Sequence, residues 1–155
     1  MKRNAFTLVE LIFVIVIIGV LAAIAVPQFR QLQENAQIAN IVKYYSDILT
    51  SAKSSYLNEV ELNNVTPAAL NLTQLYDFRG RGWVISNNND TATYTVSIGG
   101  ADQTLAVVYD NAGVITMTTT IAGAQAQRIM DKLADKTSMT FTAADVNQTI
   151  LNLTN

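Results

Sequence analysis

The sequence predicts an α+β protein in which one long N-terminal helix packs on a small antiparallel β-sheet, with short C-terminal helices after it. Three observations support this prediction. Residues 6–26 are almost entirely apolar, apolar residues then recur at helical spacing as far as Tyr56, and an alternation typical of strands begins after Gly80. At 155 residues, the chain is long enough for one compact domain plus an extra element.

The first apolar segment is long enough to cross a membrane. Residues 6–26 are interrupted only by Thr7 and Glu10, and at about 1.5 Å per residue they form a helix of about 31 Å. Two positive charges precede it within residues 1–5. The positive-inside rule therefore predicts a cytoplasmic N-terminus. It places everything after Pro27 on the opposite side of the membrane, outside the cytoplasm.

The helical pattern continues beyond this apolar segment. Apolar residues recur at steps of three or four: Phe29, Leu32, Ala36, Ala39, Val42, Tyr45, Leu49, Ala52 and Tyr56. Polar residues occupy the other faces, so this part of the helix is amphipathic and has one side suited to packing on a soluble domain. We expect a single helix from about residue 6 to about residue 57, followed by a loop near Asn63 and Pro67.

The C-terminal half has the pattern of an antiparallel meander. Alternating apolar residues in segments 94–98, 105–109 and 115–121 predict three or four strands, and turn residues such as Gly99 separate them. Residues 124–135 have a helical pattern. Residues 142–145, Thr-Ala-Ala-Asp, fit a capping box that would open a last short helix.

Composition excludes several classes of function. Half the residues are hydrophobic and only 14% are charged, against about 25% in typical soluble domains, which indicates that part of the chain lies in lipid. The chain has no cysteine and no histidine, so disulfides, thiolate sites and histidine-based catalysis are excluded. The formal net charge of −2 lacks the basic face of a nucleic-acid-binding protein. We expect that the protein is not an enzyme and binds no cofactor.

The segment Phe6-Thr7-Leu8-Val9-Glu10-Leu11, with the apolar run that follows it, resembles the N-terminus of type IV pilins and type II secretion pseudopilins. The resemblance covers roughly residues 1–35. It implies a prepilin leader of residues 1–5, cut by a prepilin peptidase between Ala5 and Phe6, and methylation of the new Phe6 amine. The family usually has glycine where Ala5 stands.

This resemblance also implies a division of the chain and a function. Residues 6–27 would be the transmembrane and assembly half of the helix, and residues 28–155 a soluble pilin-like domain that includes its second half. The protein would be a non-enzymatic subunit of a homo-oligomeric helical filament, assembled from the bacterial inner membrane. Its expected partners are the prepilin peptidase and methyltransferase and an inner-membrane assembly platform. The assembled filament would lie in the periplasm or outside the cell.

Two further features of the sequence indicate which kind of filament the chain would form. Type IV major pilins often close a C-terminal loop with a disulfide, and the lack of cysteine favours a type II secretion or competence pseudopilin. However, Gly80-Arg81-Gly82-Trp83-Val84 is only distantly similar to the Trp-Gly-x-Pro-Tyr segment of major pseudopilins. A major pilin for adhesion or motility is the alternative. From another class, a single-pass membrane-anchored binding module would also carry such a helix.

Glu10 is the main candidate for an assembly residue. An unpaired carboxylate inside the hydrocarbon costs several kcal/mol, so an intramembrane acid indicates a functional partner. The resemblance implies that this partner is the Phe6 amine of a neighbouring subunit, which would fix the register between subunits. Alternatively, Thr7 and Glu10 form a capping box that satisfies the start of their own helix. The two roles are compatible.

Gly19 and Pro27 each weaken a helix, glycine by about 1 kcal/mol and proline by about 3 kcal/mol. One interpretation is a simple kink in a membrane helix. The other, which the resemblance implies, is that residues 19–26 unwind on assembly and let the filament stretch.

The N-terminus also imitates an ordinary secretory signal. Lys2 and Arg3, the apolar core and Ala23-Ile24-Ala25 together fit such a signal with its cleavage site. Its apolar core lies at the upper length limit and contains Glu10, and the helical pattern continues beyond Pro27. These features favour the prepilin interpretation.

Three weaker candidates complete the site residues. Asn147 lies in a glycosylation-like sequence that ends at Thr149. Asp102 and Asp110, which we expect in adjacent turns, are candidate calcium ligands, although turn formation explains both. The aromatic residues expected in the core or at a sheet edge are Tyr76, Trp83, Tyr94 and Tyr109.

Overall fold

The structure, a computed structural model, describes residues 6–141 and 146–154. Contacts divide the chain into two units, Met1–Ala36 and Gln37–Asn155. The first unit consists, in its described part, of the beginning of helix α1 (Leu8–Leu57). Pro27 lies inside α1 without breaking it, so the prediction of one long helix that ends near residue 57 is confirmed.

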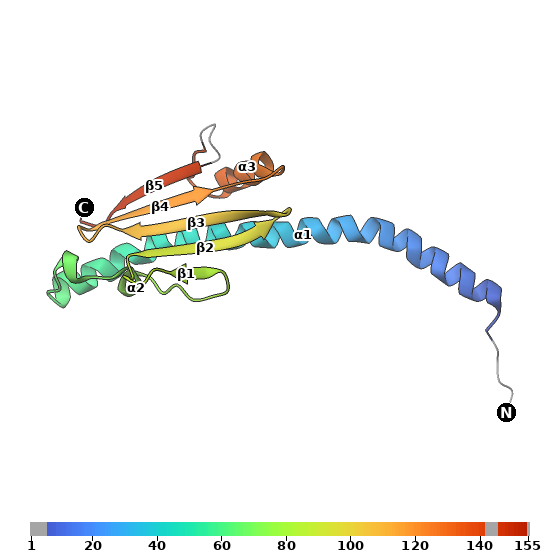
Figure 1. Cartoon of the computed structure of the whole chain (residues 1–155), viewed down its shortest axis with the longest axis horizontal. Coiled ribbons are helices and arrows are strands. Elements are labelled where there is room, and N and C mark those ends of the chain that lie inside the picture. Colours follow the sequence, from blue (N-terminus) through green and yellow to red (C-terminus); the bar gives the residue numbers. More distant parts are fainter. Residues whose placement is uncertain (1–5, 142–145, 155) are drawn as a thin grey trace, which may run out of the picture. The chain divides into compact units, whose positions relative to one another are not determined.

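The second unit contains the rest of α1 and all other elements, which follow one another along the chain with short connections (Figure 1). In order, they are the π-helical η1 (Asn58–Leu62), the 3-10 helix η2 (Pro67–Ala69), α2 (Leu72–Leu75), β1 (Trp83–Ile85), β2 (Thr91–Ile98), β3 (Ala101–Tyr109), β4 (Val114–Thr120), α3 (Ala126–Lys136) and β5 (Val146–Asn152). Helix α3 confirms the helix expected over residues 124–135.

The five strands form one sheet in the order β1-β2-β3-β4-β5, and every neighbouring pair is antiparallel. This is the predicted meander. The three segments recognised from alternation are β2, β3 and β4. The short strand β1 and the C-terminal strand β5 extend the sheet on its two sides, which makes it wider than the three or four strands expected.

The last short helix was a wrong prediction. The capping-box residues 142–145 lie outside the described residues, but the segment directly after them is strand β5. It pairs with β4 from Val114↔Asn152 to Thr120↔Val146. Pairing with the open edge of β4 satisfies the backbone of this segment, and such tertiary pairing outweighs a local capping signal. The β-branched residues Val146, Thr149 and Ile150 were the sequence signal for a strand.

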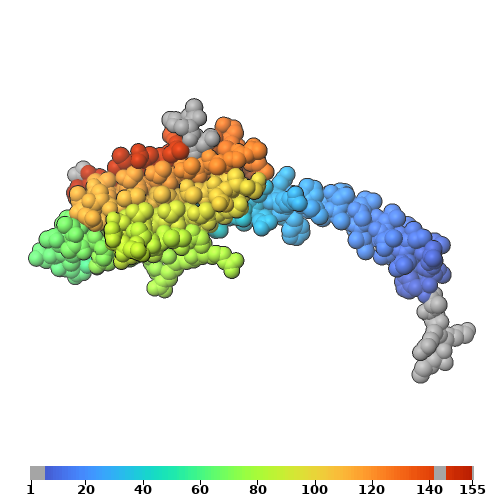
Figure 2. All heavy atoms as spheres, in the orientation of Figure 1, coloured from blue at the N-terminus to red at the C-terminus, as the bar shows by residue number. Residues whose placement is uncertain are grey.

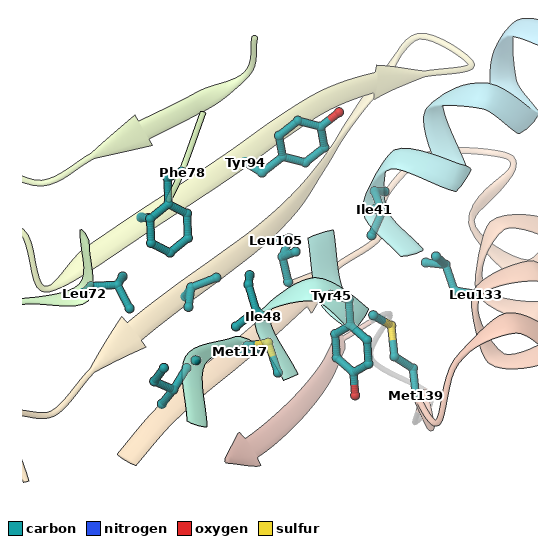
Figure 3. Packing of buried hydrophobic residues seen from close by; sticks show 14 of the residues in the cluster. Ile41, Tyr45, Ile48, Leu72, Phe78, Tyr94, Leu105, Met117, Leu133 and Met139 are labelled. Atoms are coloured by element: carbon teal, nitrogen blue, oxygen red, sulfur yellow. The ribbon is translucent and has the colours of Figure 1, made fainter. Parts of the chain in front are cut away.

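The second half of α1 packs on the inner face of the sheet (Figure 3). The helix residues buried there are Ile38, Ile41, Tyr45, Ile48, Ala52 and Tyr56. The predicted apolar stripe was partly wrong, because Ala39 is exposed and Val42 and Leu49 are only half-buried. The buried face is an adjacent one, on which Ile38, Ile41 and Ile48 also recur at steps of three or more and supply larger apolar side chains than Ala36 and Ala39.

A chain of partly buried hydrogen bonds links α1 to β5. Thr149 Oγ1 donates to Asn147 Oδ1 at 3.1 Å, so the Tyr45 hydroxyl is the donor in its 2.9 Å bond with Thr149 Oγ1. Asn147 Nδ2 in turn donates to the Thr140 carbonyl at 2.8 Å. These bonds satisfy polar groups that would otherwise be costly to bury, and they fix the C-terminal strand against the helix.

Ionisation of the Tyr109 phenol makes the free energy of unfolding depend on pH in the alkaline range. Burial, with Tyr56 and Asp110 nearby, raises the pKa of its phenol from 10.0 to about 12, and its hydroxyl donates to the Pro67 carbonyl at 2.9 Å. The folded chain therefore keeps a proton that the unfolded chain releases above about pH 10. The resulting contribution to stability is complete below about pH 10 and is lost as the pH rises to about 12.

We therefore expect the free energy of unfolding of the full chain in detergent to fall between about pH 10 and about pH 12. Tyr109→Phe should make this fall shallower. The substitution should not abolish the fall in free energy, because burial also raises the pKa values of Tyr76 and Tyr94. Denaturant titrations at a series of pH values measure the slope. An identical slope in both proteins would show that Tyr109 does not carry the effect.

Candidate assembly site

The start of α1 is closed by a reciprocal capping box between Thr7 and Glu10. Thr7 donates to Glu10 Oε2 from its backbone N at 3.0 Å and from Oγ1 at 2.8 Å. The Glu10 backbone N donates back to Thr7 Oγ1 at 3.3 Å, and Leu11 N donates to the Thr7 carbonyl at 3.3 Å. The sequence interpretation of Glu10 as a helix cap is therefore seen in the single subunit.

Capping leaves the Glu10 carboxylate with acceptor capacity. Its two oxygens can accept about four hydrogen bonds, and the capping box uses Oε2 for two of them. Glu10 is exposed, as is every residue from Phe6 to Gln33. A donor from another molecule can therefore reach the carboxylate without breaking the cap.

The first half of α1 presents an apolar surface on all sides. Side chains such as Phe6, Leu8 and Phe13 are more than half exposed. Within the described residues, one helix, Leu8–Leu62, is long and apolar enough to cross a membrane, and its most apolar window has a mean hydropathy of 3.1 with none of it buried. An apolar surface of this size needs lipid or other protein around it.

Gly19 and Pro27 lie within this exposed helix. A Cβ added at Gly19 would meet no atom within 4 Å, so no contact inside the subunit requires glycine there. Pro27 has no backbone N–H, which leaves the carbonyl of Ala23 without its helical donor. The helix nevertheless stays regular between the two, so any unwinding of residues 19–26 would belong to another state.

The calcium candidates lie far apart, contrary to expectation. Asp102 is the second residue of β3 and Asp110 follows its last residue, so the two are about 26 Å apart along an extended strand. They cannot hold one ion. Asp110 Oδ1 instead accepts hydrogen bonds from the backbone N of Ala112 and Val114, the turn role that the sequence also allowed. The described residues contain no cluster of three or more carboxylates that could hold a metal.

The glycosylation candidate Asn147 is buried in the folded protein. Asn147 is only 6% exposed, and its amide nitrogen donates to the Thr140 carbonyl. Attachment of a glycan would require breaking that bond and opening the core. Local sequence gave a match, but β-pairing turns this residue inward.

The aromatic residues have the predicted structural role. Tyr94 and Tyr109 are buried, and Tyr76 and Trp83 are half-buried against the core. Trp83 packs edge-on against Tyr44, which lies on α1 and was not identified from the sequence, at 5.3 Å between ring centroids.

The long N-terminal helix and the meander sheet on its second half define a pilin-like α+β protein. Comparison with known proteins gives the family. Residues 1–26 match the family described as Prokaryotic N-terminal methylation motif. The type IV narrow pilus major component PilA5 of Thermus thermophilus is 33% identical over 118 residues, which cover 68% of this chain and 96% of that protein. The chain belongs to the type IV pilin family.

Two further relatives are fimbrial proteins. A fimbrial protein of Pseudomonas aeruginosa is 39% identical over 66 residues, 42% of this chain and 43% of that protein. The chain thus spans less than half the length of that relative. Fimbrial protein EcpB of Eikenella corrodens is 36% identical over 101 residues, 63% of this chain and 61% of that protein. No solved structure matches the chain. The relatives are named as structural proteins of pili, not as enzymes.

Proposed function

We propose that this chain is the structural subunit of a type IV pilus-like filament. The observation that carries the proposal is a fully exposed apolar helix with one carboxylate, Glu10, near its start. In the membrane, lipid surrounds the helix. On assembly, neighbouring helices replace the lipid, so the apolar surface stays out of water in both states.

The proposed role of Glu10 is to fix the register of this assembly. Cleavage after Ala5 creates a cationic amine at Phe6, and the carboxylate of a neighbouring subunit is its natural partner. Two opposite charges that pair away from water attract strongly, whereas either one alone is costly to bury. A subunit docked in the wrong register would leave both unpaired.

The remaining proposals concern location, partners and flexibility. We infer an inner-membrane precursor with a cytoplasmic N-terminus, a leader of residues 1–5, an assembly half of residues 6–27 and a soluble domain of residues 28–155. A prepilin peptidase and methyltransferase would process it, and an assembly platform would extract it from the membrane. Residues 19–26 would unwind on assembly, because Gly19 and Pro27 lower the cost of doing so.

Among filament types, we propose a pilus. Its support is that PilA5 is named as a pilus major component and the other relatives as fimbrial proteins. The lack of cysteine favoured a secretion or competence pseudopilin. However, it concerns only the disulfide that often closes one C-terminal loop of major pilins. At native expression, a pilus subunit should appear in the fraction sheared from whole cells. A pseudopilin should stay with the cell envelope.

Processing provides a test of the proposed function. Intact-mass spectrometry of the sheared or membrane-extracted protein should show a chain that begins at Phe6 and carries one added methyl group. The reason is that the basic residues 1–5 precede the apolar helix as a leader does. A mature chain beginning at Val26 would instead identify an ordinary secretory signal and exclude a filament subunit.

A further inference from the structure

Two surfaces of the soluble domain carry opposite charge. Residues 54–76, which include η1, contain two glutamates and no lysine or arginine. Residues 78–89, which include β1, contain two arginines and no aspartate or glutamate. We call Glu59, Glu61 and Leu62 the acidic patch, and Arg79, Arg81 and Val84 the basic patch.

Each patch combines charge with an exposed apolar side chain. Leu62 is 78% exposed and Val84 is 70% exposed, the two highest values among large apolar side chains in the described part of the second unit. Among the described residues, neither Glu61 nor Arg81 has an ion-pair partner. An interface can use both features, because apolar burial favours binding and complementary charge sets orientation.

Two glycines hold the basic patch in place. A Cβ added at Gly80 would lie 2.8 Å from Tyr44 Oη, and one added at Gly82 would lie 2.8 Å from the Thr95 carbonyl oxygen. Both glycines also have positive φ, +126° and +101°. The loop therefore lies close against α1 and β2, and the arginine beside each glycine is exposed.

The two patches lie at different positions along α1. The basic patch is beside Tyr44, whose ring centroid is 5.3 Å from that of Trp83. Asn58, where η1 begins, comes fourteen residues after Tyr44, about 21 Å further along a helix. Figure 2 shows the green segment near residue 60 at one end of the domain, and lime-green atoms near residue 80 projecting from its side. Pairing of the two patches therefore requires another molecule.

A second copy of this chain carries the complement of each patch. A contact between two different surfaces of identical subunits is heterologous, and such contacts propagate into an open helical filament unless the rotation closes a ring. We propose that the acidic patch of one subunit docks on the basic patch of another subunit in the same filament. This proposal rests on the proposed function, because the apolar helices must first bring the subunits together.

The contact is small, since η1 has five residues and β1 has three. It does not have to hold two free molecules together. Once the apolar halves of α1 pack, each patch is held near a neighbouring subunit at high effective concentration, so a weak contact is enough to select the orientation of the domains. The full chain in detergent should therefore remain monomeric, and the patches should pair only in filaments.

Paired cysteines test this contact. The chain has no cysteine, so Glu61→Cys combined with Arg81→Cys introduces one thiol in each patch. The long side chains of an ion pair keep two backbones further apart than a disulfide can span, so a short bis-maleimide is the appropriate reagent. Filaments of the paired variant should give a ladder of dimers, trimers and longer species, because every subunit uses both patches. Each single variant should give no ladder.

The matched control combines Arg81→Cys with Gln148→Cys, at an exposed position on β5, and should stay monomeric. Equal ladders from the two pairs, or no ladder from the first pair, would overturn the proposal. A crosslink from either single variant to a different protein would also overturn it, because that protein would then be the partner. If the first pair makes no filaments, Glu59→Cys combined with Arg79→Cys replaces it.

Charge reversal provides a second, independent readout. Glu61→Lys and Arg81→Glu should each lower the yield of sheared filaments about fivefold, because each replaces an attraction by a repulsion. The double variant should recover most of the wild-type yield, since it restores an opposite pair. Asp102→Lys makes the same change in charge at an exposed position outside both patches and should leave the yield unchanged.

The outcomes separate this contact from the filament itself. Wild-type yield from both single charge variants, or no recovery in the double variant, would overturn the contact between the patches and leave the filament intact. If the wild type itself gives no filaments, the proposed function fails instead.

Discussion

Filaments of the Glu10→Gln variant are expected to be few or malformed, although the protein should still be inserted into the membrane and cleaved. Glutamine has nearly the size of glutamate and lacks only the charge. It also caps a helix in the same way, because the capping box accepts either residue at this position. The change therefore keeps the bonds with Thr7 and removes only the pairing with a neighbour's Phe6 amine.

The expected fall in filament yield is large because the contact between Glu10 and a neighbour's Phe6 amine is lost in every subunit. Loss of about 1.4 kcal/mol per contact lowers an association constant about tenfold, and the unpaired amine that remains costs more. We expect at least about a tenfold fall in sheared filaments. Electron microscopy of the sheared fraction, with immunoblots of sheared and membrane fractions, measures it.

Thr7→Ala is the matched control. It breaks the capping box but keeps the carboxylate, at a cost of about 1 kcal/mol to the helix start. Filament yield should fall much less than in Glu10→Gln, provided that mass spectrometry shows normal cleavage. Normal filament yield from Glu10→Gln at normal membrane levels would mean that the carboxylate is only a helix cap. The chain would still be a filament subunit, but its register would not depend on a pair between Glu10 and Phe6.

Ile48→Ala should destabilise the soluble domain by about 2–5 kcal/mol. Ile48 is fully buried where α1 meets the sheet, so truncation removes packed methyl groups and leaves a cavity. Such a loss is a large share of the 5–15 kcal/mol by which typical domains are stable. Denaturant unfolding of the full chain in detergent, followed by near-ultraviolet signals of the sheet aromatics, measures the change.

Ile150→Ala is the comparison variant. It makes the same chemical change on β5, where the side chain is 68% exposed, and should cost less than about 1 kcal/mol. Equal losses for the two variants would show that the face of α1 carrying Ile48 does not form the core. Both variants should still insert into the membrane, because neither changes the apolar half of the helix.

Much of the fold follows from local sequence. The long helix is dictated by an uninterrupted apolar run joined to a 3.6-residue pattern, and only backbone hydrogen bonds within the segment are needed to form it. Strands β2, β3 and β4 follow from alternation between turn residues. Thr7 and Glu10 lie three residues apart, so their capping box was also predictable.

Tertiary structure decided what local sequence left open. On α1, contact with the sheet buries Ile41 and Ile48 and leaves Ala39 exposed, so the buried face lies beside the predicted one. Residues after 145 carry both a capping signal and β-branched residues, and the open edge of β4 makes them a strand that turns Asn147 inward. Asp102 and Asp110 are close in sequence, but an extended strand separates them. By itself, the sequence determined the helix, the meander and the candidate site, because these depend on neighbours along the chain. Which face is buried and which strand closes the sheet depend on residues distant in sequence, and only the packed structure brings those together.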